Sequence, residues 1–258
     1  MEFCKDKPLF TSIKKDSTGQ VAEVNMGTCF CNGESFPCVE KIWKKSEEDS
    51  FEEFVKVNGS EDRNIKAVLD KYGPHVHYVK NMTAYMEWIS CQDMRTYFKG
   101  FNLETDTEKI KEIIGAIEEC LEFMKDHGVC HGDFHGGNVL VCGNENIFHS
   151  IRLIDIDTMK INYKCGDAGQ LYADIIYQLS TKPPTIDMAD RLAMQTYFMS
   201  RREKIISILN GILQEISPGN KSIKNPDLSP EKQKRIEKNV INFTFKAWYE
   251  KLLKSKTS

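Results

Sequence analysis

One segment, residues 129–157, constrains the fold of this chain more than any other. A polar stretch at residues 131–138 leads into an apolar run at 139–141. A turn at 143–146 separates this run from a second one, which ends at Asp155. Two short apolar runs joined by a turn predict a β-hairpin, because each run can form one strand. The hairpin would return the carboxylate of Asp155 to the place where the polar stretch begins.

Three polar side chains would then meet at one end of the hairpin. Asp133 and Asn138 belong to the polar stretch, and Asp155 follows the second strand. A carboxylate and an amide oxygen that face a second carboxylate make an oxygen-rich site, of the kind that Mg²⁺ accepts together with substrate phosphates. In this arrangement Asp133 is left free to receive a proton.

The sequence HGDFHGGN at residues 131–138, followed by LID at 153–155, resembles the catalytic and metal loops of the protein-kinase-like superfamily. The resemblance implies that Asp133 positions and deprotonates an acceptor hydroxyl. It also implies that Asn138 holds one Mg²⁺ and that Asp155 bridges Mg²⁺ to the phosphates of ATP. Mg²⁺ is thus the expected cofactor, and ATP the expected co-substrate.

Three residues depart from the pattern of eukaryotic protein kinases. Gly132 stands where those kinases usually have arginine. His135 stands where they have a lysine that contacts the transferred phosphate, which makes His135 a candidate catalytic residue. The third residue of the metal loop is Asp157 and not glycine, so an extra carboxylate is expected near the metal. The stretch as a whole looks more like aminoglycoside and choline phosphotransferases, or compact microbial kinases.

A metal-hydrolase reading rests on the recurrence of histidine every four residues, at His127, His131 and His135. This spacing places the three rings on one face only if the segment is helical. Four glycines within residues 128–137 make a helix improbable. The spacing is therefore interpreted as accidental.

The start of the chain, at residues 8–43, alternates and turns like an antiparallel sheet. Asn32 and Gly33 mark a hairpin turn, and the following strand carries Lys41. This strand looks like the kinase strand whose lysine pairs with the ATP phosphates, with Lys41 as that lysine. Gly19 is the candidate for the glycine of the loop that covers the phosphates.

A helix is predicted before residue 72, because apolar side chains at 65, 68, 69 and 72 share one helical face. Glu61 lies one turn before this face and is the candidate ion-pair partner of Lys41. Glu52 and Glu53, in an earlier helical stretch, are the alternatives. For each glutamate, a solvated surface position is about as plausible as the pairing.

Residues 76–89 are predicted to form two strands that lead into a connecting segment. Residues 85–89 resemble the interlobe hinge of kinases, in which backbone groups around Glu87 to Ile89 would face the adenine ring. A domain boundary is expected near Ile89. The resemblance thus implies an α+β, two-lobed fold, with a small antiparallel sheet in residues 1–89 and a mostly helical lobe in residues 90–258.

The second lobe is predicted from helical spacing. Apolar residues within 110–124 form a stripe with the period of a helix, and further helices are expected at 171–179, 189–216 and 231–253. Between the metal loop and the first of these, only residues 158–169 intervene, so a long activation segment is absent. Asp174 resembles the buried aspartate that anchors the catalytic loop in this family. A solvated helix carboxylate is the alternative.

Composition excludes some classes of partner. The net charge of −3 gives no reason to expect nucleic acid as a partner. An apolar run near eighteen residues is missing, so no membrane span is expected, and the first six residues do not resemble a signal peptide. The nine cysteines are scattered without a framework. They predict reduced thiols and an intracellular setting.

The sequence therefore predicts an ATP-dependent phosphotransferase. A protein Ser/Thr hydroxyl is favoured as the acceptor, because the chain is short and lacks an obvious helical insertion to enclose a small molecule. The short segment after Asp157 fits compact kinases such as microbial effectors delivered into host cells. A small-molecule kinase is the alternative, and a pseudokinase acting as a binding module is the third reading. If activity is low in isolation, an activating protein partner on the helical lobe is the preferred explanation.

Overall fold

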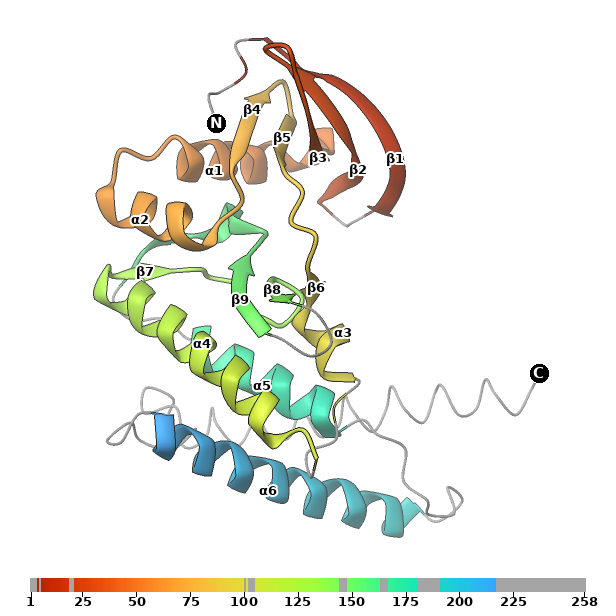
Figure 1. Ribbon diagram of the computed structural model, residues 1–258, viewed down its shortest axis with the longest axis vertical. Helices are drawn as coiled ribbons and strands as arrows, with labels where there is room; N and C mark the ends of the chain where they lie inside the picture. The colour runs from red at the N-terminus through yellow and green to blue at the C-terminus, as the bar shows by residue number, and fades with distance from the viewer. Residues whose placement is uncertain are drawn as a thin grey trace, which may run out of the picture.

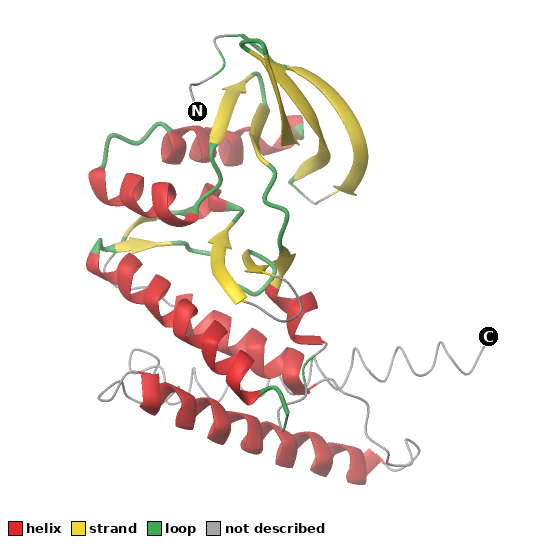
Figure 2. Cartoon of the chain, viewed as in Figure 1, coloured by secondary structure: helices red, strands yellow, loops and turns green. Residues whose placement is uncertain are grey.

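The structure is a computed structural model with a strand-rich end and a helix-rich end (Figure 2). It describes residues 4, 6–18, 21–99, 101, 105–143, 148–162, 167–180 and 191–216. Gly19 and the helix predicted at 231–253 lie outside these residues. The mixture of an antiparallel sheet with several helices is compatible with the predicted α+β class.

A five-stranded antiparallel sheet forms the strand-rich end, in the order β1-β2-β3-β5-β4 (Figure 1). The turn between the second and third strands has positive φ at both Asn32 (53°) and Gly33 (84°). This is the conformation that a two-residue hairpin turn requires, and it explains why the hairpin could be predicted. The strands are β1 (Leu9–Thr18), β2 (Ala22–Cys31), β3 (Glu34–Trp43), β4 (Val76–Lys80) and β5 (Thr83–Glu87).

Two helices lie between the third and fourth strands in sequence: α1 (Glu48–Asn58) and α2 (Arg63–Tyr72). Asp62 caps the start of α2, because its Oδ1 accepts from the backbone N–H of Asn64 (2.8 Å). The helix ends where Gly73 and Pro74 prevent continuation. Helix α1 contacts β3, and α2 contacts α1. The two helices thus fill the space beside the sheet (Figure 1).

The helix-rich end is built on α4 (Thr107–Asp126), which carries the predicted apolar stripe. Helix α4 contacts α6 (Arg191–Ile216), and α6 in turn contacts α5 (Asp167–Ser180). The chain enters this end through residues 88–91, β6 (Gln92–Asp93) and α3 (Met94–Lys99). The side chains of α4 that are buried are Ile110, Ile113, Ile114, Ile117, Cys120 and Met124.

The predicted hairpin consists of β8 (Val139–Gly143) and β9 (Phe148–Leu153). Val139 pairs with Leu153, and the N–H of Ile154 donates to the carbonyl of Asn138 (3.0 Å). The end of the polar loop and the residue before Asp155 are therefore neighbours, as the sequence predicted. Two further strands, β7 (Val129–Cys130) and β10 (Lys160–Ile161), pair with each other. In sequence, β7 comes directly before the polar loop and β10 follows Asp155.

The prediction of reduced thiols was wrong. Disulfides join Cys4 to Cys31, Cys29 to Cys38, and Cys91 to Cys142. Cys120 is buried in α4 as a thiol, and burial raises its pKa to about 12. The pairs escaped sequence analysis because the pairing and packing of separate segments, which sequence spacing does not reveal, bring these cysteines together. Disulfides persist mainly in oxidising compartments, so this basis for an intracellular setting is removed.

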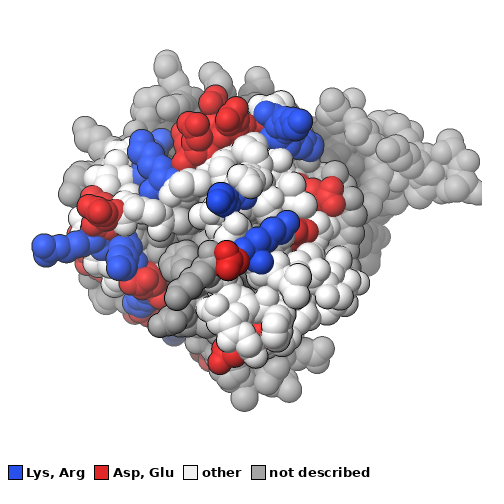
Figure 3. Space-filling model, turned by 90° about the horizontal axis from the view of Figure 1, so that it is seen from above, with Lys and Arg blue, Asp and Glu red and all other residues white. Residues whose placement is uncertain are grey.

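The surface seen from the strand-rich end carries acidic and basic side chains among uncharged ones (Figure 3). One group of acidic side chains lies at the upper edge of this view with basic side chains on either side, and neither sign covers the face. Among the helices that the structure describes, none is both long and apolar enough to cross a membrane.

Candidate functional site

A pocket of about 460 Å³ lies where the sheet, the segment after β5 and the β8–β9 hairpin meet. Part of its lining is apolar, with Val24, Met26 and Val39 from the sheet and Leu140 from the hairpin. Five charged residues line it as well: Lys41, Glu87, Asp93, Asp155 and Asp157. A concave site with apolar walls and a few convergent charges is the usual form of a small-molecule site.

Lys41 is the centre of the charged part. Its Nζ lies 2.6 Å from Oδ1 of Asp155, and 3.0 and 2.9 Å from the two carboxylate oxygens of Asp157. It also lies 4.8 Å from the ring centroid of Trp43, within the range of a cation–π contact. One buried ammonium is therefore shared by two carboxylates that stand two residues apart in sequence.

Burial and charge act against each other on these groups. Burial lowers the pKa of Lys41, but attraction to Asp157 and then Asp155 outweighs it, and the net pKa is raised. Burial raises the pKa of Asp157; attraction to Lys41 lowers it, and repulsion from Asp155 raises it further. The net pKa of Asp157 is raised, because one ammonium does not offset burial together with a second carboxylate. Lys41 therefore remains a cation at neutral pH.

Asp155 has a left-handed backbone conformation, with φ 57° and ψ 49°. Few residues other than glycine adopt it, and such residues cluster at functional sites. The conformation turns the chain from β9 into the short 3₁₀ segment Ile156–Thr158. The side chain of Asp155 is 55% exposed, so it reaches both Lys41 and solvent in the pocket.

The polar loop depends on a glycine at position 132. Gly132 has φ +86°, and a Cβ there would lie 2.6 Å from the carbonyl oxygen of Thr158. The same Thr158 donates from Oγ1 to the carbonyl of His131 (2.7 Å). No other residue fits this position without displacing the segment after Asp155. The departure from the kinase arginine at 132 thus has a local steric reason.

His131 is a structural residue of the loop. It is fully buried, and its Nε2 lies 3.0 Å from the carbonyl oxygen of Ile154. Burial lowers its pKa, which favours a neutral ring that donates from Nε2. Within the described residues, no cluster of three His, Cys, Asp or Glu side chains could hold a metal ion. The recurrence of histidines at 127, 131 and 135 therefore makes no metal site.

Two aspartates of α5 hold the backbone of the loop. Asp174, which was predicted to anchor it, accepts from the N–H of Gly136 (2.7 Å) and pairs with Arg95 (2.6 Å). Asp167 was missed, although it is buried and accepts from the N–H groups of His131 (2.7 Å) and Gly132 (3.2 Å). The predicted helix began at residue 171, so Asp167 was assigned to the segment before it, whereas α5 begins at Asp167.

We expect Asp167→Ala to lower the free energy of unfolding by roughly 1.5–3 kcal/mol, because it leaves two loop N–H groups without their charged acceptor. Chemical denaturation of the purified protein measures this loss. The matched control is Asp70→Ala on the exposed face of α2, where the change should stay within about 0.5 kcal/mol. Equal effects of the two substitutions would contradict the anchoring role.

Asp133, His135 and Asn138 form one connected group in the loop. Nδ2 of Asn138 donates to the backbone carbonyl of Asp133 (3.0 Å), which leaves its amide oxygen for another partner. Nδ1 of His135 accepts from the N–H of Gly137 (3.1 Å), so its Nε2 carries the proton in the neutral ring. That Nε2 lies 3.6 Å from Oδ2 of Asp133. Gln170, which was not predicted, donates to Oδ1 of Asp133 (2.8 Å).

The predicted partner of Lys41 was wrong. Glu61 lies exposed before α2, and Glu52 and Glu53 are exposed on α1. The residue of α1 that approaches Lys41 is Phe54, with its ring centroid 5.9 Å from Nζ. Sequence reasoning sought a glutamate on a helix, whereas the chain supplies aspartates from the segment after β9.

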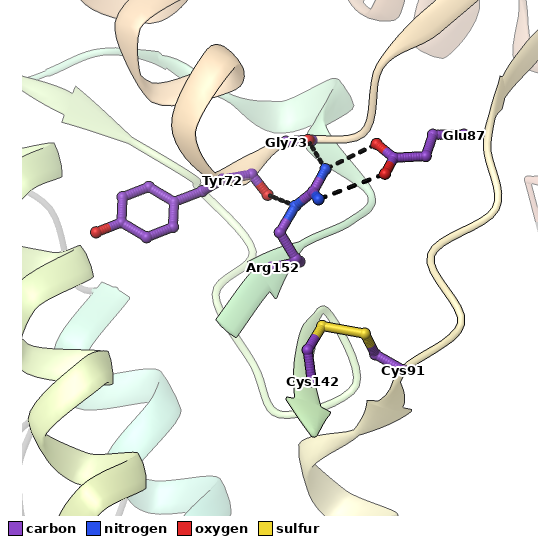
Figure 4. The surroundings of a disulfide bond; sticks show 6 residues. All are labelled: Tyr72, Gly73, Glu87, Cys91, Cys142 and Arg152. Atoms are coloured by element: carbon purple, nitrogen blue, oxygen red, sulfur yellow. Dashed lines mark hydrogen bonds and ion pairs between the residues drawn. A yellow bond between two sulfur atoms is a disulfide. The ribbon is translucent and has the colours of Figure 1, made fainter. Parts of the chain in front are cut away.

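Glu87, the last residue of β5, and Ile89 both line the pocket. The Glu87 side chain points to Arg152 of β9, with Oε2 2.8 Å from Nη2 (Figure 4). Arg152 also donates to the carbonyls of Tyr72 (3.3 Å) and Gly73 (2.6 Å). The side chain of Glu87 is therefore engaged by Arg152, and its backbone N–H donates to the carbonyl of His75 (2.8 Å).

The donor set suits a hard cation. Asp155 lines the pocket and contacts Lys41 through Oδ1 alone, which leaves its other carboxylate oxygen. Asn138 has an amide oxygen not used in its contact with Asp133. Mg²⁺ prefers one or two carboxylates and keeps its other positions for water and phosphate oxygens. The residues present fit Mg²⁺.

Comparison with known proteins gives a partial similarity. No protein-family model matches the chain. Over 84 residues the chain is 29% identical to a protein of Dictyostelium discoideum described as a probable serine/threonine-protein kinase. The matched part is 33% of this chain and 17% of that protein, so this chain covers a small share of that relative. The similarity links part of the chain to a probable kinase at a distance.

Proposed function

We propose that this chain is an ATP-dependent phosphotransferase with a two-lobed, protein-kinase-like fold. The observation that carries the proposal is the group of Lys41, Asp155 and Asp157 in a pocket that also has apolar walls from the sheet and the hairpin. A nucleotide consists of a flat aromatic base, a sugar and charged phosphates, and these walls and charges suit the base and the phosphates. The partial similarity to a probable kinase points in the same direction.

ATP would bind with its base against the apolar walls. Val24 and Val39 line the sheet side of the pocket, and Leu140 lines the hairpin side. Backbone groups of Glu87 to Ile89 would contact the edge of the base. The phosphates would lie against Lys41, whose charge is kept by its two carboxylates.

Mg²⁺ would be held by Asn138 and Asp155, and when bound it would neutralise charge on the phosphates. Asp133 would align the acceptor hydroxyl and accept its proton, because its carboxylate is 46% exposed on the loop. Gln170 would fix the orientation of that carboxylate. His135 would contribute by contact with Asp133 or the transferred phosphate. Catalysis in such a site rests mainly on positioning and charge neutralisation.

A protein Ser/Thr hydroxyl is our favoured acceptor. The relative in Dictyostelium is described as a probable serine/threonine-protein kinase, which supports this choice. A small-molecule acceptor is the alternative, and its support is the loop sequence HGDFHGGN at 131–138. Gly132 is required there by backbone geometry, so one of the features behind this alternative has a structural explanation that is independent of the acceptor.

Nucleotide binding is tested first by thermal unfolding. Mg²⁺ and ATP at about 100 times the dissociation constant should stabilise the protein by about 2.7 kcal/mol, which raises Tm by roughly 5–10 °C. Asp155→Ala should remove most of the Mg²⁺-dependent part of the shift. Glu61→Ala, an exposed position away from the pocket, is the control and should keep the full shift. No Mg²⁺-dependent shift at millimolar ATP would contradict the proposal.

Transfer is tested with radiolabelled ATP. The protein is offered generic protein substrates, a cell lysate, and a panel of hydroxyl-bearing metabolites that includes aminoglycosides and choline. Labelled protein bands would support a protein acceptor, and labelled metabolite would select the alternative. Nucleotide binding without any transfer, even after a lysate is added to supply an activating protein, would identify a non-catalytic binding module.

A further inference from the structure

The two carboxylates that contact Lys41 do so in different ways. Asp157 uses both oxygens, at 3.0 and 2.9 Å, and only 13% of its side chain is exposed. Asp155 uses one oxygen, at 2.6 Å, and 55% of its side chain is exposed. The Asp157 carboxylate is therefore occupied by Lys41 on both oxygens, whereas Asp155 retains an oxygen and open space for another partner.

Helix α1 offers no carboxylate to Lys41 among the described residues. It contacts the segment Ile156–Thr158, and it places buried Phe54 near Nζ. Its glutamates at 52 and 53 are exposed. Lys41 is thus held between an aromatic wall, made by Trp43 and Phe54, and the segment that begins at Asp155.

We propose that Asp157 is the positioning residue for Lys41, and that it thereby leaves Asp155 available to the metal. This inference rests on the proposed function, because it assigns separate tasks to the two carboxylates of that site. Asp157 fixes the position at which the Lys41 ammonium contacts the phosphates, and Asp155 binds Mg²⁺. Both lie in one short segment, so the position of Lys41 depends on that segment and not on a movement of α1.

Removing Asp157 should have a particular consequence. Without Asp157, Lys41 has one carboxylate partner left, Asp155. The ammonium and this carboxylate would then pair only with each other. Lys41 would then be misplaced for the phosphates, and Asp155 would be drawn away from the metal. A misplacement of about 1 Å can cost up to roughly 100-fold in rate, so the loss should appear mainly in kcat and less in KM for ATP.

The test compares Asp157→Asn with Asp155→Asn, a matched change two residues away. An acyl phosphate derivative of ATP transfers its acyl group to a lysine amine beside the phosphates and releases ATP. Labelling of Lys41 is measured by peptide mass spectrometry, without Mg²⁺ and at one fixed pH. Loss of either carboxylate also favours the neutral, reactive amine of Lys41, so the two variants are compared with each other. We expect labelling of Lys41 in Asp157→Asn to be about tenfold lower than in Asp155→Asn. Asp157→Glu keeps the charge and should recover part of the labelling.

A second measurement reports on Mg²⁺ binding. Asp155→Asn should remove most of the Mg²⁺-dependent thermal shift with ATP, whereas Asp157→Asn should reduce it less. Circular dichroism of each variant without ligand is the control for folding. Glu52→Gln, on the exposed face of α1, should leave all readings unchanged.

The outcomes separate this inference from the proposed function. Equal labelling of Lys41 in Asp157→Asn and Asp155→Asn would overturn the positioning role while leaving nucleotide binding intact. If wild-type Lys41 is not labelled and ATP produces no thermal shift, the proposed function itself is overturned, and the assignment of Asp157 with it.

Discussion

Asp133→Asn should lower the rate of phosphoryl transfer by about 10²–10⁴-fold, the usual range for loss of a general base. Asparagine keeps the shape of the side chain and can still contact Gln170, but it cannot accept the proton of the hydroxyl. Asn138 and Asp155, which would hold the metal, are unchanged. ATP affinity, measured by thermal shift, should therefore stay close to that of the wild type.

Lys41→Ala is the comparison for this prediction. It removes a cation that is buried in the pocket and paired with two carboxylates, so it should weaken phosphate orientation and leave Asp155 and Asp157 to repel each other. Nucleotide binding and rate should fall together, unlike in Asp133→Asn. If Asp133→Asn retained the wild-type rate with the best acceptor, Asp133 would not be the base.

The second large effect is expected from the disulfide between Cys91 and Cys142. It fastens the segment after the pocket residue Ile89 to strand β8, and the residues beside it pair as β6 and β8. The ion pair of Glu87 with Arg152 holds the same segment from its other side (Figure 4). Replacing both cysteines by serine should lower the free energy of unfolding by roughly 2–4 kcal/mol, because the bond closes a chain separation of 51 residues.

Urea unfolding under non-reducing conditions measures this loss. The control is the same comparison after treatment with a dithiol, which reduces the disulfides in both proteins and should bring the two stabilities together. Mass spectrometry of alkylated peptides counts the thiols at 91 and 142. Free thiols at both positions in untreated protein, with unchanged stability in the double serine variant, would contradict the bond.

Several features were determined by the sequence alone, because their signals are local. Asn32 and Gly33 adopt the positive φ values that their residue types favour, so the hairpin between β2 and β3 could be predicted. The spacing of apolar residues in α4 predicts which face of the helix is buried. The hairpin β8–β9 also follows from two apolar runs and a turn, and it accounts for the closeness of residues 138 and 154.

The partners of the functional residues were decided only by the tertiary structure. Lys41 and Asp157 are 116 positions apart, and their contact depends on how the sheet sits against the hairpin. A glutamate on a helix and an aspartate after a strand are equally good partners for an ammonium, and local spacing does not choose between them. Here buried Phe54 occupies the side of α1 that approaches Lys41, so the aspartates take the role.

The same reason applies to Asp167 and to the cysteines. Asp167 lies before the helix predicted from sequence, and only the fold brings it to the N–H groups of residues 131 and 132. Cys91 and Cys142 become a pair only when β6 is placed beside β8. Residue type and periodicity specify which local element forms, whereas pairings across the chain depend on packing that no single segment contains.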